Sequence, residues 1–333
     1  MSSMFKRGPN RMTRQEIRIG TRGSQLALYQ ANWVREKLLQ THPHLKVTLI
    51  KIKTTGDKIQ DAPLAKIGGK GLFVKEIEEA LKDERIDLAV HSIKDVPTDF
   101  PEGLHLSAIT KREDPQDVLI SKGGTRLKDL PRGAKIGTSS LRRQAQLLHF
   151  RGDFQMIPLR GNLDTRMKKL DSQNLDGIVL ALAGVRRLGL ESRVSEIIPM
   201  EICLPAIGQG ALGIETRKRD QGVEEHIQFL NDPISSVAVA AERAFLKRLE
   251  GGCQVPIAAF GRIAGSALQI DGLVGTIDGK RLVRHRVEGR IEEAESLGTM
   301  LAEILLSKGA REILDEVYQR SGPPVSIEEQ NNG

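Results

Sequence analysis

Two stretches of the chain follow the same alternating order of strands and helices, and this repeat limits the folds open to it. The first stretch is predicted to form strand, helix, strand, helix and strand over residues 17–20, 25–39, 47–53, 73–82 and 86–90. The second repeats the order over residues 134–137, 141–149, 154–159, 164–170 and 176–181. Ile19-Gly20-Thr21 in the first stretch is echoed by Ile136-Gly137-Thr138 in the second. Because such alternation is typical of parallel sheets with helices on both faces, each stretch is predicted to form one α/β lobe.

The remainder of the chain indicates how the lobes are connected. Asp114-Pro115 and the stretch from Pro199 to Gly213 are predicted to cross between the lobes. A different pattern follows residue 232: a helix ending at Leu249, strands at 270–274 and 282–287 joined by the hairpin signal Asp278-Gly279, and a final amphipathic helix or helix pair over 292–318. The predicted fold class is α/β, with two similar doubly wound lobes flanking a cleft, as in periplasmic binding proteins, plus a small α+β third domain.

The expected domains follow from these boundaries. They are a flexible leader (1–16), a first lobe (17–112 plus 206–230), a second lobe (113–205), an α+β domain carrying the Cys253 loop (233–320) and a disordered tail (321–333). In such open α/β sheets, ligands bind outside the carboxyl ends of the strands.

Composition narrows the class of ligand. The chain has 333 residues, a net charge of +7 and a pI near 9.4, which suits nucleic acid, acidic membranes or a polyanionic small molecule. Aromatic residues make up only 3%, too few for the stacking surfaces of single-stranded nucleic-acid binders. No apolar run has the length of a membrane span. We therefore expect a small polyanionic ligand, with neither nucleic acid nor membrane as partner.

The cysteine content and the basic N-terminus bear on location. Two cysteines are too few for a disulfide framework, which favours a reducing compartment. The leader carries four basic residues and no acid before Glu16, but no apolar signal region follows it. A cytoplasmic protein is the expectation, with a degenerate transit segment as the alternative.

Arginines gather after predicted strands, mainly in the second lobe. They are Arg22, Arg142, Arg143, Arg160, Arg166, Arg186 and Arg187. Arg142 and Arg143 lie in the first turn of a predicted helix, behind Ser139 and Ser140 as candidate caps, and helix N-termini attract anions. A single surface arginine is usually only solvated. Since guanidinium groups bind carboxylates through a planar fork, this grouping predicts a site for several carboxylates at once.

One carboxylate is predicted to lie among these cations. Asp95 follows a buried strand in Val90-His91-Ser92-Ile93-Lys94-Asp95-Val96-Pro97, where the cleft should open. An ordinary turn aspartate is the alternative, but a carboxylate held in a cleft can donate a proton, accept one or stabilise a cation.

Other motifs exclude several chemistries. The run Ile67-Gly68-Gly69-Lys70-Gly71 lacks the spacing of a phosphate-binding loop and fits a mobile lid carrying Lys70 better. No motif typical of a metal site or of a serine or cysteine nucleophile is present, so no metal is expected. Cys203 is expected in the core.

Cys253 differs from Cys203 because two glycines precede it. Gly251 and Gly252 can end the preceding helix, and Pro256 prevents an immediate return to helix. A buried structural cysteine is the alternative, but this loop predicts an accessible attachment point.

Five segments carry a resemblance to a known family. They are Gly20-Thr21-Arg22-Gly23-Ser24, Gly68-Gly69-Lys70-Gly71-Leu72-Phe73, His91-Ser92-Ile93-Lys94-Asp95-Val96-Pro97, Gly137-Thr138-Ser139-Ser140-Leu141-Arg142-Arg143 and Leu249-Glu250-Gly251-Gly252-Cys253-Gln254-Val255-Pro256. In this order, over about residues 17–318, the chain resembles the porphobilinogen deaminases, also called hydroxymethylbilane synthases.

The resemblance implies a transferase that condenses four porphobilinogen molecules head to tail, releases ammonia and forms the linear tetrapyrrole hydroxymethylbilane for haem biosynthesis. It implies a dipyrromethane primer bound to Cys253 through a thioether, and Asp95 as the catalytic carboxylate. It also implies a monomer that hands its product to uroporphyrinogen-III synthase.

The resemblance further assigns the binding residues. Cofactor binding is implied for Lys94, Thr138, Ser139, Arg142, Arg143 and Arg160, and substrate binding for Arg22, Ser24, Lys70, Arg166 and Arg187. Gly23 stands where a larger residue is often found, which leaves the role of Arg22 intact and puts local loop contacts in doubt.

Two other functions are compatible with parts of the sequence. A two-lobed carboxylate-binding protein would share the lobes and the arginines, because fold does not fix function, but it would need neither Cys253 nor Asp95. A nucleic-acid binder would explain the pI, but neither the low aromatic content nor the position of the arginines.

Overall fold

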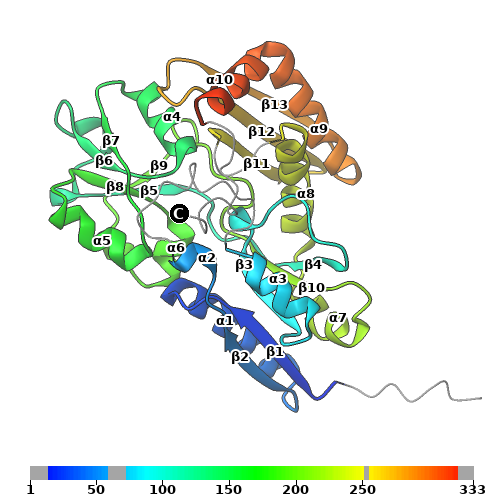
Figure 1. Cartoon of the computed structure of the whole chain (residues 1–333). Coiled ribbons are helices and arrows are strands. Elements are labelled where there is room, and N and C mark those ends of the chain that lie inside the picture. Colours follow the sequence, from blue (N-terminus) through cyan, green and yellow to red (C-terminus); the bar gives the residue numbers. More distant parts are fainter. Residues whose placement is uncertain (1–13, 59–72, 251–254, 322–333) are drawn as a thin grey trace, which may run out of the picture.

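The computed structural model describes residues 14–58, 73–250 and 255–321. Figure 1 shows two α/β lobes and a third domain whose sheet is flanked by helices. Lys70 and Cys253 lie outside the described residues, as do nearly all of the predicted leader and tail. Within the described ranges, no helix is both long and apolar enough to cross a membrane.

The first lobe is built on a five-stranded sheet with the order β2-β1-β3-β10-β4. Its strands are β1 (Glu16–Thr21), β2 (Lys46–Lys51), β3 (Leu88–Ser92), β4 (Leu104–Ile109) and β10 (Leu212–Arg217). Its helices are α1 (Gln25–Thr41), α2 (Thr55–Lys58), α3 (Lys75–Lys82) and α7 (Gln221–Ile227). Apolar side chains of β1 and β3 pack with α1 on one face of the sheet, and Ala89 of β3 packs with α3 on the other.

The second lobe has the same topology, with the order β7-β6-β8-β5-β9. Its strands are β5 (Asp117–Ser121), β6 (Lys135–Gly137), β7 (Gln155–Ile157), β8 (Gly177–Ala181) and β9 (Glu196–Ile198), and its helices are α4 (Leu141–Phe150), α5 (Leu163–Ser172) and α6 (Leu182–Arg187). Separate apolar clusters cover the two faces of its sheet. The predicted repeat is therefore present as two lobes with the same strand order.

The expectation of parallel sheets holds for three strands of each lobe, but both sheets are mixed. In the first lobe β1 runs parallel to β2 and β3, but β10 runs antiparallel to both β3 and β4. The second lobe repeats this, with β5 antiparallel to β8 and β9. The reason is that β5 and β10 come from the segments that cross between the lobes, and each enters its sheet from the opposite end.

Local signals explain where several helices begin. The Ser24 hydroxyl accepts from the backbone N–H of Ala27 at the start of α1, and Asn162 accepts from that of Thr165 at the start of α5. Such caps satisfy donors that a helix leaves unpaired at its first turn. The expectation that Ser139 or Ser140 caps α4 was wrong. Ser140 holds the cap position without a side-chain cap bond, and the Ser139 hydroxyl donates instead to the carbonyl of Leu159 (3.0 Å).

The third domain packs helices on one face of an antiparallel sheet. It contains α8 (Pro233–Arg248), β11 (Ile257–Ala264), β12 (Ala267–Gly275), β13 (Leu282–Arg290), α9 (Ala294–Leu305) and α10 (Arg311–Ser321). The predicted hairpin joins β12 to β13, and Gly279 adopts the positive φ of +69° that its turn requires. β11 was not expected.

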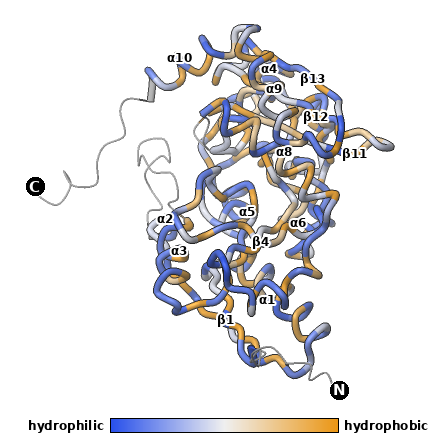
Figure 2. Tube along the Cα trace, turned by 90° about the vertical axis from the view of Figure 1, so that its right-hand side faces the viewer, coloured by the Kyte–Doolittle hydropathy of each residue, from blue (hydrophilic) through white to orange (hydrophobic). Residues whose placement is uncertain are grey.

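Figure 2 shows hydrophobic and hydrophilic residues alternating along most elements, as a fold with one buried side per element requires. The predicted fold class is confirmed.

Candidate functional site

Asp95 lies at the carboxyl end of β3, as the sequence predicts. It closes a short 3-10 turn, Ile93–Asp95, and its side chain is exposed. Across the described ranges no group hydrogen-bonds to its carboxylate. The backbone after it is fixed from the third domain, because Arg243 of α8 donates to the carbonyls of Val96 (3.2 Å), Pro97 (2.6 Å) and Thr98 (3.2 Å). The turn is therefore held in place while the carboxylate stays available.

Lys94 points toward the junction between the lobes. Its Nζ lies 3.5 Å from Oε1 of Gln209, on the segment that returns to the first lobe. Burial lowers the pKa of Lys94 to about 8 because it disfavours the ammonium form. Asp95 and Asp117 oppose this shift, while Arg143 and Arg142 add to it. Lys94 thus lies in one electrostatic environment with residues of both lobes.

Arg142 and Arg143 share one buried carboxylate. Arg142 Nη1 lies 2.6 Å from Asp117 Oδ2, and Arg143 Nη2 lies 2.7 Å from Asp117 Oδ1. All three side chains are nearly inaccessible. Burial alone would raise the pKa of Asp117, but the two guanidinium groups outweigh it and hold the pKa well below its usual range. The arginines that were expected to meet ligand carboxylates are already paired within the protein.

Gln209 and Cys203 complete the surroundings of Asp117. Gln209 Nε2 donates to Asp117 Oδ1 (2.9 Å) and to the carbonyl of Pro115 (2.5 Å), which joins the two crossing segments. The Cys203 thiol lies 3.3 Å from Asp117 Oδ2 and is fully buried, as expected of a core residue. The Nε atoms of Arg142 and Arg143 are buried and have no hydrogen-bond partner among the described residues. Each guanidinium therefore keeps a donor that its protein partners do not use.

Arg160 and Arg166 differ from this pair because, in the part of the chain that the structure describes, no carboxylate lies within ion-pair distance of either. Both side chains are half-buried, and Arg166 Nε donates only to the carbonyl of Gly161 (2.9 Å). The pKa of Arg166 is lowered to about 10, mainly by burial and also by the positive charges of Arg143 and Arg160, while Asp95 opposes the shift. Burial likewise lowers the pKa of Arg160. Arg160 and Arg166 thus lie in the surroundings of Asp95 with no carboxylate partner in the described ranges.

Arg22 and Arg187 have other partners. Arg22 forms an ion pair with Asp57 (2.5 Å) and lies over the ring of Phe73, with its guanidinium carbon 4.2 Å from the ring centre. Arg187 Nη2 donates to the carbonyl of Gly210 (2.7 Å), a contact between α6 and the returning segment. The structure does not bring these two arginines into contact with Asp95.

The remaining predicted residues lie at helix starts. Thr138 is buried and accepts from the backbone N–H of Ser140 (3.2 Å), while Ser139 is exposed beside it. Ser24 is occupied in capping α1.

Sequence reasoning missed Asp117, Gln209 and Asp57. Asp117 had a usable signal, because it begins the otherwise apolar strand Asp117–Ser121, and a charge at the head of a buried strand needs a partner. Gln209 stands in an irregular segment and Asp57 in the four-residue helix α2, and neither gives such a signal.

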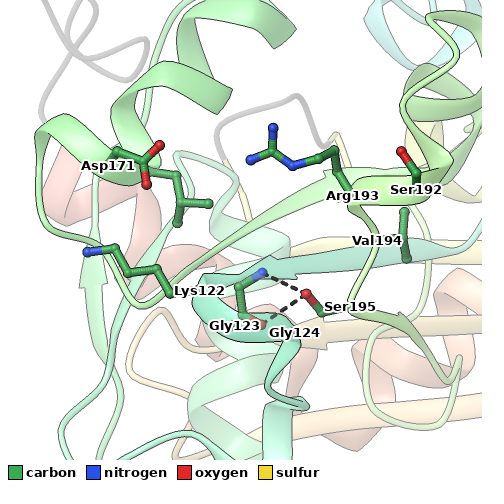
Figure 3. A pocket seen from close by; sticks show the side chains of 10 residues that line it. Lys122, Gly123, Gly124, Asp171, Ser192, Arg193, Val194 and Ser195 are labelled. Carbon is green, nitrogen blue, oxygen red and sulfur yellow. Dashed lines mark hydrogen bonds between the residues drawn. The ribbon is translucent and has the colours of Figure 1, made fainter.

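A surface pocket of the second lobe is separate from this site. Figure 3 shows Lys122, Asp171 and Arg193 around it, and none of the predicted site residues lines it.

The two similar lobes, and two arginines without a carboxylate partner among the described residues near a carboxylate at a strand end, are typical of proteins whose ligands bear several carboxylates. The chain belongs to the porphobilinogen deaminase family. Residues 17–225 match the family's "dipyromethane cofactor binding domain" and residues 236–307 match its C-terminal domain.

Similar curated proteins agree with this membership. A porphobilinogen deaminase of Pelobacter propionicus is 58% identical over 309 residues, covering 93% of this chain and 99% of its own. One of Geobacter sulfurreducens is 57% identical, covering 93% and 97%. Among solved structures, the methionine-binding protein MetQ matches 64% of this chain and 89% of its own, with 13% identity and a TM-score of 0.43.

The predictions of family, activity and cofactor are therefore confirmed. The chain is a transferase that condenses four porphobilinogen molecules head to tail, with loss of ammonia, into hydroxymethylbilane, and it uses a dipyrromethane cofactor.

Proposed function

We propose that this reaction takes place between the lobes, with Asp95 as the catalytic carboxylate and Cys253 as the covalent attachment point of the cofactor. The observation that carries the proposal is the exposed carboxylate of Asp95 beside Arg160 and Arg166, which have no carboxylate partner among the described residues. Polycarboxylate substrates supply the missing anions. The helix that leads to Cys253 also supports it, because Arg243 of α8 holds the backbone that follows Asp95.

The residues around Asp95 fit a dipyrromethane with acidic side chains. Arg142 and Arg143 keep buried Nε donors without partners in the described residues, and Lys94 stands next to Asp95. We propose that Lys94, Thr138, Ser139, Arg142, Arg143 and Arg160 hold the cofactor. We propose that Arg22, Ser24, Lys70, Arg166 and Arg187 bind substrate. When bound, the dipyrromethane supplies the free pyrrole carbon to which the first substrate is joined.

Asp95 performs electrostatic and proton-transfer work on the substrate. When the substrate amine leaves, positive charge develops on its pyrrole ring, and a fixed carboxylate stabilises this charge. Asp95 can also protonate the leaving amine or accept a hydrogen bond from the pyrrole N–H. Each added ring brings carboxylates that must meet guanidinium groups, since an unpaired buried charge costs several kcal/mol. The arginines therefore set where each ring lies relative to Asp95.

The test separates catalysis from cofactor attachment. We expect Asp95→Ala to keep its fold and the mass of the attached dipyrromethane, while turnover falls by about 10²–10⁴-fold. Cys253→Ser should show the mass of the bare polypeptide and no turnover. Asp99→Asn, an exposed neighbour, serves as the control and should retain full activity. An active Asp95→Ala, or a Cys253→Ser that still carries the added mass, would refute the corresponding role.

We also propose the domain boundaries expected from the sequence, and that the chain acts as a cytoplasmic monomer that passes its product to uroporphyrinogen-III synthase. The exposed large hydrophobic residues support a monomer, because in the described ranges they are scattered over different elements, as with Tyr29, Ile197 and Met300. Light scattering in solution tests the oligomeric state.

A further inference from the structure

Three titratable side chains are buried together beneath the strand that leads to Asp95. His91 of β3 and Glu215 of β10 form a direct contact, with Nε2 of His91 2.8 Å from Oε2 of Glu215. Their side chains are 5% and 1% exposed, and Glu78 of α3 is 9% exposed. None of these residues is part of the site proposed above. A buried group of this kind requires an explanation, because ionised side chains are rarely buried without full compensation.

The three side chains share one face of the sheet. Glu215 lies opposite Ala89 in the ladder between β10 and β3, and His91 is two residues beyond Ala89 on the same strand. Since alternate residues of a strand point to the same face, His91 and Glu215 point to the face on which Ala89 packs. Ala89 belongs to the apolar cluster that α3 forms on that face. The helix that carries Glu78 therefore covers the face to which His91 and Glu215 point, and both residues act on Glu78 through their charge.

The charges within this group do not balance when both carboxylates are ionised. Oε1 of Glu215 is buried and has no hydrogen-bond partner in the described part of the chain. The pKa of Glu78 is raised to about 7, mainly by burial and also by the negative charges of Glu215 and Glu79. Opposing cations come from His91 and from Lys82 of α3. Arg217 of β10 does not supply this compensation, because its guanidinium donates to the carbonyls of Leu81 and Ile86 and pairs with Asp220.

We propose that Glu78, Glu215 and His91 are positioning residues for the reaction. Glu78 keeps a proton, this proton preserves the contact between Glu215 and His91, and the contact fixes the end of β3. The inference rests on the proposed role of Asp95, which follows His91 by four residues. The link is short: the N–H of Ile93 donates to the carbonyl of Ala211 (3.1 Å), next to β10, and Ile93 opens the turn that ends with Asp95.

Loss of this proton changes the forces on β3. Two adjacent buried carboxylates then share one imidazole, and their repulsion acts across the contact between α3 and the sheet. The Glu215–His91 contact joins side chains of β3 and β10 close to the end of β3, so its disturbance displaces that end. Turnover should therefore fall as pH rises through about 7, while substrate affinity, which depends on the arginines, changes little.

The experiment compares Glu78→Gln with Glu79→Gln. Glutamine keeps the shape and neutrality of the protonated carboxyl, so Glu78→Gln should retain kcat at pH 6 and lose less of it between pH 6 and 8 than the wild type, with KM unchanged. Glu79 is exposed on the same helix, and its variant should follow the wild-type profile. Glu215→Gln weakens the acceptor of His91, and we expect a fall in kcat at all pH values without a change in KM.

Two readouts do not depend on Asp95. The folded state holds a proton on Glu78 that the unfolded chain releases above its ordinary pKa of 4.5, so this group makes stability fall as pH rises from about 4.5 to 7. Glu78→Gln should flatten this part of the dependence of Tm on pH. The ring resonances of His91, which report on its neighbours, should change with pH differently in Glu78→Gln and in the wild type.

Wild-type and Glu78→Gln proteins with identical kcat profiles would overturn the positioning role. Identical Tm slopes together with identical His91 ring resonances in the two proteins would overturn the proton on Glu78. An active Asp95→Ala would instead refute the proposed function, while the Tm and His91 readouts could still reveal the proton on Glu78.

Discussion

Arg142 and Arg143 are neighbours in the sequence, and their guanidinium groups meet at Asp117. The carboxylate is fully buried and also accepts from Gln209, so removal of its charge leaves two buried cations without their anion. We expect Asp117→Asn to lower the free energy of unfolding by about 3–5 kcal/mol, the cost of breaking a buried ion pair from one side. Chemical denaturation followed by circular dichroism measures this difference.

Asp83→Asn is the matched control, since Asp83 is exposed and pairs with Arg85 only at 3.5 Å. It should leave the midpoint unchanged, and an equal loss in both variants would contradict the assignment. The pKa of Asp117 is lowered in the folded state, so its contribution to stability is complete above pH 4 and decreases as the solution is acidified. Asp117→Asn should therefore lose stability less steeply than the wild type below pH 4.

Individual residues were predictable to different degrees. The position of Asp95 followed from a general rule, because ligands meet open sheets at the carboxyl ends of strands. The ion pairs of Arg142, Arg143 and Arg22 were not predictable. Their acidic partners, Asp117 and Asp57, are distant in sequence, and only the folded chain places them together.

The α8–α9 pair illustrates packing between elements. An ideal Cβ at Gly298 of α9 would lie 2.0 Å from the carbonyl oxygen of Ala241 in α8. Because the obstacle is helix backbone, it cannot rotate away as a side chain would. We expect Gly298→Ala to separate the helices and lower the free energy of unfolding by about 1–3 kcal/mol, measured by thermal and urea unfolding.

Gly222→Ala supplies the comparison. Gly222 lies in α7, and the nearest atom to its ideal Cβ is 3.9 Å away. Alanine favours helix by about 0.5–1 kcal/mol over glycine, so this variant should be equal to or more stable than the wild type. If Gly298→Ala were also neutral, the close approach of α8 and α9 would be incorrect.

The order of elements was largely predictable, but the direction of two strands was not. Periodicity located the repeated strands and helices, since a strand and a helix differ in the spacing of their apolar residues. β5 and β10 stand beside proline- and glycine-rich crossing segments, and their partners are set by the path of the chain between lobes. β11 was missed because its small residues, Ala258, Ala259 and Gly261, give little hydrophobic alternation.

Glu242 connects the third domain to the first lobe. Its fully buried carboxylate on α8 pairs with Arg112 (2.5 Å), which follows β4, and accepts from the N–H groups of Gly208 (2.6 Å) and Gly261 (2.8 Å). We expect Glu242→Gln to lower the free energy of unfolding by about 3–5 kcal/mol. Calorimetry should show a broader transition, because the domains lose a shared anchor.

Glu303→Gln is the control, because it tests whether the loss of any acidic partner of an arginine lowers the stability by the same amount. Glu303 also pairs with an arginine, Arg248 (2.6 Å), but is 53% exposed, and exposed pairs contribute less than about 1 kcal/mol. Its transition should stay close to that of the wild type. A narrow, unshifted transition for Glu242→Gln would rule out the anchoring role.

The position of β10 in the sequence affects the order in which the two lobes can fold as the nascent chain leaves the ribosome. Every strand of the second sheet has been synthesised by Ile198, whereas the first sheet lacks β10 until Arg217 has emerged. β10 is also an inner strand, without which β4 has no neighbour. The first lobe begins earlier in the chain, but its sheet is completed later than that of the second lobe. The second lobe can therefore fold while the sheet of the first lobe still lacks β10.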